Sequence, residues 1–248
     1  MSILQKIVAN TKANLVLKKA EFPLEKIQGS LENLKLPRGK FKDHISNKDE
    51  AIIAEIKKAS PSAGVIKEDF DPTKIAMDYE SFGASALSIL TEEDFFMGSV
   101  EYLKEVKKIT SLPILRKDFM IDEYQIYESK LIGADCILLI ASILTDQEIE
   151  DFINIAKKLD LDYLIEVHDE NELKRVEHFE DALIGVNNRN LETFEVDLNN
   201  SVRLKHTFRQ KNIFIAESGI KSREDMDYLK MNNIKVFLIG ESLMRGSF

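Results

Sequence analysis

Eight short apolar runs, spread between residues 51 and 240, constrain the fold of this chain more than any other feature. Each run has about the length of one β-strand. None alternates strictly between apolar and polar residues, which is typical of parallel strands buried on both faces. The runs are AIIAEIK (51–57), ALSIL (86–90), LPILRK (112–117), DCILLI (135–140), DYLIEV (162–167), ALIGVN (182–187), NIFIAES (212–218) and KVFLIG (235–240). They predict eight parallel strands.

Amphipathic stretches separate these runs and begin at residues that commonly cap helices. Ser99, Thr145 and Ser222 each precede apolar residues at helical spacing. Gly83 and Gly133 stand where two of these helices should stop before the next strand, as C′ glycines do. The chain therefore alternates between predicted strands and predicted helices.

This alternation predicts an α/β fold with a parallel sheet. About eight strand–helix units in roughly 200 residues predict a closed (β/α)8 TIM barrel. An open, doubly wound sheet is the structural alternative, but the even spacing of the later units favours the barrel. The length of 248 residues suits a single barrel domain.

Residues 1–50 do not share the alternation. The segment ILQKIVANTKANLVLKKA (3–20) predicts an amphipathic helix, and prolines and glycines interrupt the stretch that follows it. We expect residues 1–50 to form an N-terminal helical extension that packs on a barrel of residues 51–248, rather than a second domain.

Charge and hydropathy exclude some partners. The net charge of −9 argues against nucleic acid, because binding to its phosphates needs a basic surface. A small anionic substrate stays compatible, because a pocket can be basic on an acidic protein. No apolar run approaches the ~18–20 residues of a membrane span, and the N-terminus lacks the apolar stretch of a signal peptide. These features predict a cytoplasmic protein without a membrane partner.

The cysteine and the histidines do not suggest a redox or metal site. Cys136 lies within an apolar run and is predicted to be a small core residue, and one cysteine cannot form an internal disulfide. The four histidines are too scattered to match the ligand spacing of a metal site, so no metal is expected. His168 follows the fifth run and could touch the pocket, but we favour a solvated or helix-capping role.

Charged and polar side chains recur at the carboxyl ends of the predicted strands, where the active site of a barrel lies. Side chains alternate across a strand, so Glu55 and Lys57 share a face with the apolar Ile53. The same alternation directs three further side chains toward the barrel mouth: Lys117, Glu166 and Asn187. These residues predict a pocket, with a structural ion pair at the mouth as the alternative for the first strand.

Lysine and glutamate side chains in one pocket can transfer protons at a carbonyl group. Lys57 or Lys117 could instead attack a carbonyl to form a Schiff base, and the residue types alone leave both uses open. Arg116 and Asp118 fall on the opposite alternation to Lys117, so we expect them to form a structural ion pair or a cap.

Glycines and aromatic residues near the strand ends extend this prediction. Gly219 and Gly240 follow the last two strands, where barrels often bind phosphate through backbone N–H groups that a glycine exposes. Phe96 and Phe119 follow the second and third strands. They are candidates for an apolar wall that faces an aromatic substrate, with packing of the loops as the alternative.

Six segments resemble the signature segments of the indole-3-glycerol phosphate synthase family. They are IAEIKKASPSAG, SILTEEDFFMGS, PILRKDF, LIEVHDENEL, IGVNNRNLETFEVD and IAESGI. The resemblance covers nearly the whole chain, including an N-terminal helix of the ILQKI type. The motifs are specific as a set, because related phosphate-binding barrels do not combine AE-x-KKASPS with LRKDF.

The resemblance implies a carboxy-lyase of tryptophan biosynthesis. The family closes the ring of 1-(2-carboxyphenylamino)-1-deoxyribulose 5-phosphate with loss of carbon dioxide and water, and it uses no cofactor and no metal. Lys117 matches the general acid that protonates the ketone, and Glu166 matches the general base of the dehydration. Glu55 matches a residue that positions the proton-transfer network, and Lys57 matches one that binds the substrate carboxylate or phosphate.

Other matched residues are implied to contact the substrate. Asn187 and Ser218 match catalytic-site residues of the family that make polar contacts to the substrate. The apolar wall around the anthranilate ring is matched by Phe96, Phe119, Leu138 and Leu191. Further substrate-binding positions are matched by Ser60, Arg189, Glu217, Gly219, Gly240 and Glu241.

One departure and two alternatives accompany the resemblance. The family usually continues past the eighth strand into a final helix, whereas this chain ends at RGSF, so we expect a barrel shortened after that strand.

The alternatives are a sugar-phosphate isomerase barrel of the phosphoribosylanthranilate isomerase type, which lacks the KKASPS loop, and a catalytically silent phosphate-binding barrel. The expected partner is a small sugar phosphate, and the expected state is a monomer or a weak homodimer.

Overall fold

The computed structural model describes residues 2–34, 40–46, 48–191 and 193–248. Its centre is a closed barrel of eight parallel strands in the order β1–β10–β9–β8–β7–β6–β5–β4, with β4 pairing back to β1. The strands are β1 Ala51–Ile56, β4 Ala86–Leu90, β5 Ile114–Lys117, β6 Cys136–Ile140, β7 Asp162–Val167, β8 Leu183–Asn187, β9 Phe214–Glu217 and β10 Val236–Ile239. Each lies within the run that predicted it, and the closed order excludes the open sheet.

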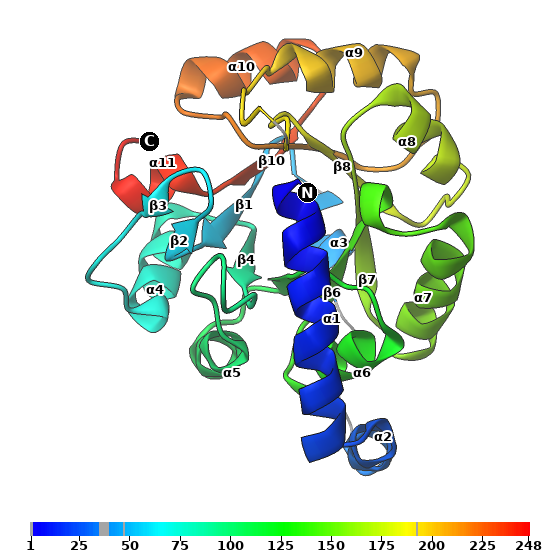
Figure 1. Ribbon diagram of the computed structural model, residues 1–248. Helices are drawn as coiled ribbons and strands as arrows, with labels where there is room; N and C mark the ends of the chain where they lie inside the picture. Colours follow the sequence, from blue (N-terminus) through cyan, green and yellow to red (C-terminus); the bar gives the residue numbers. More distant parts are fainter. Residues whose placement is uncertain (1, 35–39, 47, 192) are drawn as a thin grey trace.

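Helices connect successive strands and surround the barrel (Figure 1). They are α4 Pro72–Phe82, α5 Val100–Ile109, α6 Glu123–Leu131, α7 Asp146–Lys158, α8 Glu170–Val176, α9 Asn199–Thr207, α10 Arg223–Met231 and α11 Glu241–Arg245. The predicted caps Ser99, Thr145 and Ser222 accept hydrogen bonds from backbone N–H groups in the first turns of α5, α7 and α10. Gly83 and Gly133 adopt left-handed φ angles of 97° and 92° after α4 and α6, as predicted.

Two short elements complete the connections. A two-stranded antiparallel hairpin of β2 Ala59–Ser60 and β3 Gly64–Val65 follows β1, and the sequence analysis did not predict it. The N–H of Ala59 bonds to the carbonyl of Phe96, so the hairpin is tied to the loop after β4. After β10 the chain forms the five-residue helix α11, which packs against β1. A short helix therefore does follow the eighth strand.

Apolar side chains on alternate strand positions fill the barrel interior. Ile53, Leu115 and Leu164 are fully buried there. α3 (Phe41–Ser46) covers the amino-terminal end of the barrel by packing its buried apolar side chains against the starts of β1 and β4. Cys136 is 0% exposed in the same group, which confirms its predicted place in the core.

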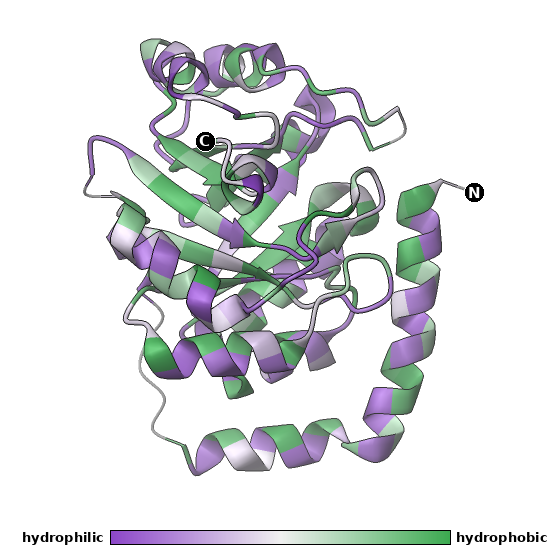
Figure 2. Ribbon diagram, turned by 90° about the vertical axis from the view of Figure 1, so that its left-hand side faces the viewer, coloured by the Kyte–Doolittle hydropathy of each residue, from purple (hydrophilic) through white to green (hydrophobic). Residues whose placement is uncertain are grey.

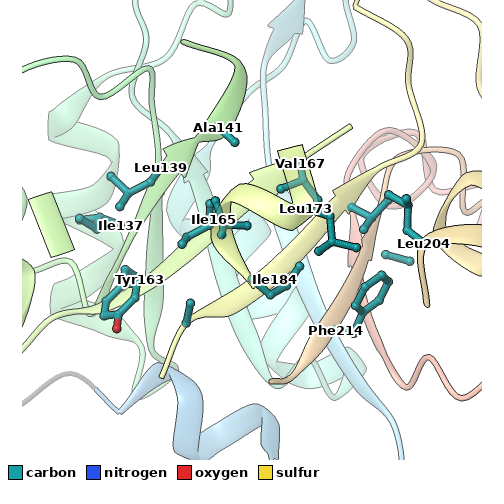
Figure 3. Packing of buried hydrophobic residues seen from close by; sticks show 14 of the residues in the cluster. Ile137, Leu139, Ala141, Tyr163, Ile165, Val167, Leu173, Ile184, Leu204 and Phe214 are labelled. Carbon is teal, nitrogen blue, oxygen red and sulfur yellow. The ribbon is translucent and has the colours of Figure 1, made fainter. Parts of the chain in front are cut away.

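The opposite strand positions pack outward against the helices. Figure 3 shows Ile137, Ile165 and Ile184 on neighbouring strands, and all three belong to one buried cluster with Leu173 of α8. In Figure 2 the strands are mostly hydrophobic, whereas the helices around them mix hydrophobic and hydrophilic residues. Burial on both faces explains why each strand sequence is an uninterrupted apolar run.

Two further helices, α1 Ile3–Glu21 and α2 Leu24–Glu32, lie outside the strand–helix alternation. α1 confirms the helix predicted for residues 3–20 and buries Ile7, Thr11 and Leu15. Its apolar residues are not confined to that face, because Val16 and Leu17 are 67% and 70% exposed. The predicted amphipathic pattern is therefore only partly correct. None of the helices in the described ranges is long and apolar enough to cross a bilayer.

A buried arginine holds the tip of β5. Nη2 of Arg116, a residue 1% exposed, donates to Asp118 Oδ2 at 3.0 Å and lies 2.7 Å from Glu128 Oε2. The other N–H groups of the guanidinium donate to Thr91 Oγ1, the Gln125 carbonyl and Ser129 Oγ. This network confirms the structural role expected for Arg116 and Asp118, and it fixes the strand end that carries Lys117.

Replacing Arg116 by alanine should lower the free energy of unfolding by about 3–5 kcal/mol, because Asp118 and Glu128 would stay buried without their partner. Urea unfolding followed by circular dichroism measures this loss. Arg223→Ala is the matched control, because Arg223 pairs with Glu50 while 55% exposed and should contribute far less. Equal losses in the two variants would contradict the importance of burial.

Candidate active site

A cavity of about 660 Å³ opens at the carboxyl ends of the barrel strands. Every residue that the sequence analysis assigned to the site lines this cavity. The catalytic candidates are Glu55, Lys57, Lys117, Glu166, Asn187 and Ser218. The substrate-binding candidates are Ser60, Phe96, Phe119, Leu138, Arg189, Leu191, Glu217, Gly219, Gly240 and Glu241. Barrel closure thus brings together side chains that are distant in the chain.

Lys117 lies between two glutamates in this cavity. Its Nζ donates to Glu166 Oε2 at 2.5 Å and to Glu217 Oε2 at 3.0 Å. The alternation of β5 explains the direction of the side chain, because Leu115 on the same face fills the barrel interior. The side chains of Lys117, Glu166 and Glu217 are 14%, 3% and 2% exposed. Bulk water therefore screens their charges only weakly.

Charge pairing sets the protonation states of Lys117 and Glu166. Burial alone would lower the pKa of Lys117, but the surrounding carboxylates, Glu166 first, outweigh burial and raise this pKa well above its usual value. Burial would raise the pKa of Glu166, but Lys117 and His168 lower it below its usual range. At neutral pH the pair is an ammonium group in contact with a carboxylate.

Glu217 has the opposite shift. Burial and the negative charge of Glu166 raise the pKa of Glu217 to about 7, although Lys117 opposes the change. The sequence analysis placed Glu217 among the substrate-binding positions, whereas the structure directs its side chain to Lys117. The alternation of Ile215 and Glu217 along β9 contained the signal for this direction. Glu217 therefore belongs to the cluster of proton-transfer groups.

Two glycines leave room for the carboxylates. A Cβ atom on Gly185 of β8 would lie 2.0 Å from Glu217 Oε1, and one on Gly240 would lie 2.3 Å from Glu55 Oε1. Neither distance is compatible with a side chain at the glycine unless the carboxylate moves. Gly240, which was predicted to expose its backbone to phosphate, thus also makes space for Glu55. That space lets Glu55 pair with Lys57, as expected for the first strand.

The second oxygen of Glu166 points toward other partners. Asn187 Nδ2 donates to Glu166 Oε1 at 3.0 Å, and His168 Nε2 lies 3.4 Å from the same oxygen. His168 Nδ1 contacts Glu172 Oε2 at 3.2 Å, and the backbone N–H of His168 donates to that oxygen. The expectation of a solvated His168 was wrong, because its side chain is 17% exposed and lies between two carboxylates. Its backbone N–H and its ring both contact Glu172 in the first turn of α8, so the expected contact with a helix start is present.

Aromatic and aliphatic side chains form one wall of the cavity. The rings of Phe96 and Phe119 lie 5.8 Å apart between centroids, at an angle of 40°. The buried carboxylate of Glu92 positions Phe96, because Glu92 Oε2 accepts the backbone N–H of Phe96 at 3.0 Å. Leu138 and Leu191 complete the set that the sequence analysis assigned to this wall.

α1 also contributes to the wall, which the sequence analysis did not predict. Its residues Ile3, Leu4 and Ile7 line the cavity. Two side chains farther along the helix donate to Asp94 Oδ2 in the loop after β4: Asn10 at 2.5 Å and Asn14 at 2.9 Å. The helical spacing of the three apolar residues was visible in the sequence, but nothing local indicated what they would contact.

Cationic side chains line the part of the cavity formed by the loops after β8, β9 and β10. They are Arg189, Lys221 and Arg245, of which the sequence analysis identified only Arg189. Ser218 and Gly219, in the loop after β9, adopt left-handed backbone conformations, with φ angles of 66° and 83°. The positive charge and the accessible backbone of these loops suit an anionic group.

The cavity therefore combines an acid–base pair, an apolar wall and a cationic end. In the described parts of the chain, no group of three or more histidine, cysteine, aspartate or glutamate side chains is arranged to hold a metal ion. The side chains themselves can protonate a carbonyl oxygen, remove a proton and bind an anion.

Comparison with known proteins identifies related sequences. The chain matches the family model described as indole-3-glycerol phosphate synthase over residues 4–247. It is 47% identical over 245 residues to the indole-3-glycerol phosphate synthase of Ruminiclostridium cellulolyticum, with 98% of this chain and 94% of that protein covered. It is 46% identical over 243 residues to the enzyme of the same name from Clostridium acetobutylicum, with 98% and 92% covered.

Two solved structures share the fold. One is an N-acetylmannosamine-6-phosphate 2-epimerase from Clostridium perfringens, with a TM-score of 0.61, 16% identity, and coverage of 82% of this chain and 90% of that one. The other comes from the tryptophan synthase complex of Pyrococcus furiosus, with a TM-score of 0.58, 14% identity, and coverage of 79% and 88%. At these identities the likeness supports the barrel alone.

The sequence match extends over the barrel and over the N-terminal helices. Members of the matched family are carboxy-lyases that act on a small phosphorylated substrate, and the cavity is lined by every residue that the sequence analysis matched to the site of that family. The chain belongs to the indole-3-glycerol phosphate synthase family.

Proposed function

We propose that Lys117 and Glu166 are the general acid and the general base with which this chain converts 1-(2-carboxyphenylamino)-1-deoxyribulose 5-phosphate into indole-3-glycerol phosphate. The observation that carries the proposal is the 2.5 Å contact between Lys117 Nζ and Glu166 Oε2 in the 660 Å³ cavity. An ammonium group and a carboxylate at this distance can exchange a proton with each other and with a substrate bound beside them.

The substrate is proposed to span the cavity from its apolar wall to its cationic end. The aromatic ring packs against Phe96 and Phe119, and the phosphate lies near Arg189 and the backbone of Gly219. This orientation places the ketone near the ammonium group of Lys117. The charges support it, because the cationic side chains of the cavity concentrate on the loops after the last three strands.

Ring closure starts when the ring carbon that bears the carboxylate attacks the ketone carbon. Lys117 donates a proton to the ketone oxygen as the new carbon–carbon bond forms. The bond to the carboxylate then breaks, carbon dioxide leaves, and the released electron pair restores the aromatic ring. The apolar wall assists by holding the ring against the carbonyl group.

Dehydration completes the indole. The hydroxyl group leaves as water after it receives a proton from an ammonium group of the cavity, and Glu166 removes a proton from the neighbouring carbon. Lys57 and Lys117 both line the cavity, so either can supply the proton to the hydroxyl group. Glu166 can then return its proton to Lys117 across their contact.

The charges around Lys117 favour an acid over a Schiff-base nucleophile. Nucleophilic attack requires a neutral amine, whereas the neighbouring carboxylates raise the pKa of Lys117 against the effect of burial. The complete set of acid–base residues likewise disfavours a catalytically silent barrel, which would have no need to bury them.

The domain organisation is proposed from the same site, and the cellular location is proposed from the sequence. The chain is proposed to be one barrel domain of residues 51–248 with residues 1–50 as an extension, because α1 supplies part of the cavity wall. We expect it to act on its sugar phosphate in the cytoplasm, as a monomer or a weak homodimer, without a cofactor or metal.

Lys117→Ala should lower kcat by about 10²–10⁴-fold, the usual contribution of a general acid, and should change KM little, because other side chains bind the substrate. The fluorescence of the indole product, measured without added metal, reports turnover. Lys104→Ala is the matched control, because Lys104 pairs with Glu101 on the surface while 41% exposed.

Two outcomes would contradict the proposal in different ways. If the unaltered chain, shown to be folded by circular dichroism, forms no indole product, the proposed reaction is wrong. If Lys117→Ala keeps a kcat near that of the unaltered chain, the reaction stands and the assignment of Lys117 as the acid is wrong.

Gly185→Ala should lower kcat by about 10²-fold, because the added Cβ displaces Glu217 and a misplacement of ~1 Å can cost that much. The expected clash is with Glu217 Oε1 at 2.0 Å and Leu164 Cδ2 at 2.9 Å. Gly29→Ala in α2 is the control, because a Cβ there meets no atom within 4 Å. Unchanged turnover in Gly185→Ala would show that the position of Glu217 is not important.

Glu217 should hold a proton in the folded protein over a pH range in which exposed glutamates are ionised. Its pKa is raised from 4.5 to about 7, so the carboxyl group is neutral below this pH and ionised above it. Infrared spectroscopy should show the band of a protonated carboxyl group that disappears as the pH rises through about 7. The band should be missing in Glu217→Gln, and its persistence there would assign it to another residue.

A further inference from the structure

The proposed reaction has a proton balance that the residues of the cavity cannot close by themselves. The substrate takes up two protons, one on the ketone oxygen and one on the leaving hydroxyl group, and returns one proton to Glu166. Because the substrate enters as a carboxylate and loses neutral carbon dioxide, each turnover consumes one proton from solvent. A path for that proton must reach the contact between Lys117 and Glu166.

The cavity itself offers this proton a poor route when substrate is bound. The side chains of Lys117 and Glu166 are only 14% and 3% exposed, and a substrate between the apolar wall and the cationic end covers them further. Glu166 Oε2 is occupied by Lys117, but Oε1 faces away from it, toward Asn187 and His168.

His168 connects Glu166 Oε1 to the carboxylate of Glu172 in α8. Its Nε2 lies 3.4 Å from that oxygen and makes no hydrogen bond to any residue in the described ranges, while Nδ1 lies 3.2 Å from Glu172 Oε2. Such contacts shorten when a proton passes between the partners. The ring position is fixed, because the backbone N–H of His168 donates to Glu172 and its carbonyl accepts from Asn200 Nδ2 at 2.9 Å.

Glu172 lines a second cavity of about 470 Å³, which adjoins the substrate cavity at Asn187, Arg189 and Leu191. Besides His168 and Glu172, its lining includes Asp169, Asn200 and Arg203. The first cavity includes neither His168 nor Glu172. One imidazole ring thus stands between the carboxylate of the proposed base and the carboxylate of Glu172, which is 16% exposed and lines the second cavity.

We propose that His168 and Glu172 form a relay that carries the proton consumed in each turnover from the second cavity to the contact between Glu166 and Lys117. The proposal rests on the proposed roles of Lys117 and Glu166. Histidine suits the task because its two ring nitrogens can accept and donate a proton at the same time near neutral pH.

The transfers balance. A solvent proton binds Glu172 and passes to Nδ1 of His168, and the ring gives its Nε2 proton to Oε1 of Glu166. The carboxyl group of Glu166 then turns about its Cγ–Cδ bond, and the proton carried by Oε1 passes to the neutral amine of Lys117. One solvent proton is consumed, and the ammonium group and both carboxylates are restored. The ring is left with its proton on Nδ1, and it is reset when it returns that proton to Glu172 and takes up a proton at Nε2 from water as the side chain turns.

The charges around His168 support this function. Burial lowers the pKa of His168, but Glu172, Glu166 and the more distant Glu217 raise it to a value above that of a free histidine. The carboxylates on both sides of the ring therefore favour its protonated form. Both ring nitrogens also face carboxylate oxygens, which can accept a proton from either side.

His168→Ala should lower kcat by at least about tenfold, less than the ~10²–10⁴-fold contribution of a general acid itself, because water can partly replace the ring. KM should stay unchanged, because His168 does not line the substrate cavity. Imidazole, added at constant pH, should raise the kcat of this variant with increasing concentration by entering the space beside the second cavity. It should have no effect on the unaltered chain.

Further variants separate a relay from a structural role. Glu172→Gln should also lower kcat, because it removes the outer carboxylate and leaves the ring in place. His168→Gln keeps a hydrogen-bonding group but cannot carry a proton, so it should be as slow as His168→Ala. His206→Ala is the matched control, because His206 is exposed on α9.

Three results would overturn the relay. They are an unchanged kcat in His168→Ala, an unchanged kcat in His168→Gln, and a loss in His168→Ala that imidazole does not restore. If His168→Ala does not fold, an unchanged kcat in Glu172→Gln overturns it instead. If the relay is wrong but Lys117 is the acid, Lys117→Ala is still slow. If the assignment of Lys117 as the acid is wrong, Lys117→Ala has near-normal turnover.

Discussion

The structure depends on burying one ammonium group with two carboxylates at the mouth of a closed barrel. Moving a single ion of this kind out of water costs several kcal/mol, and pairing offsets that cost only when the geometry is good. The parallel register supplies the geometry, because β5, β7 and β9 bring Lys117, Glu166 and Glu217 to neighbouring positions. Gly185 on the strand between the two glutamates leaves the space that Glu217 occupies.

Surrounding interactions keep this cluster in place and divide it between two environments. The Arg116 network fixes the end of β5 from the helix side of the barrel, and Asn187 fixes one oxygen of Glu166. Glu166 therefore has one oxygen toward Lys117 and the substrate cavity, and the other toward His168 and the second cavity. Such a carboxylate can exchange a proton with Lys117 through one oxygen and receive a proton from His168 through the other. A carboxylate at a solvent-exposed strand end would exchange protons with water at both oxygens.

Much of the fold and part of the site could be predicted because the signals are local. Strand runs, helix caps and left-handed glycines depend on a few adjacent residues, and the structure confirmed them. The inward direction of Glu55 and Lys117 follows from alternation along one strand. The direction of the Glu217 side chain could be predicted from the same local alternation. The nearby Gly219 instead led to a prediction of phosphate binding at this strand end. For α1, the helix was predictable but its contact with the cavity was not, because that contact involves loops far along the chain.

The sequence by itself determined the eight strands, the helices between them, the family and the residue types that gather at the barrel mouth. Only the tertiary structure decided which charges pair, and therefore which groups hold protons. Glu166 and Glu217 are both glutamates at the ends of apolar strands, yet the pKa of one is lowered and that of the other is raised. The difference arises from distances to Lys117 and His168 and from shared burial, and these are fixed only when the barrel closes.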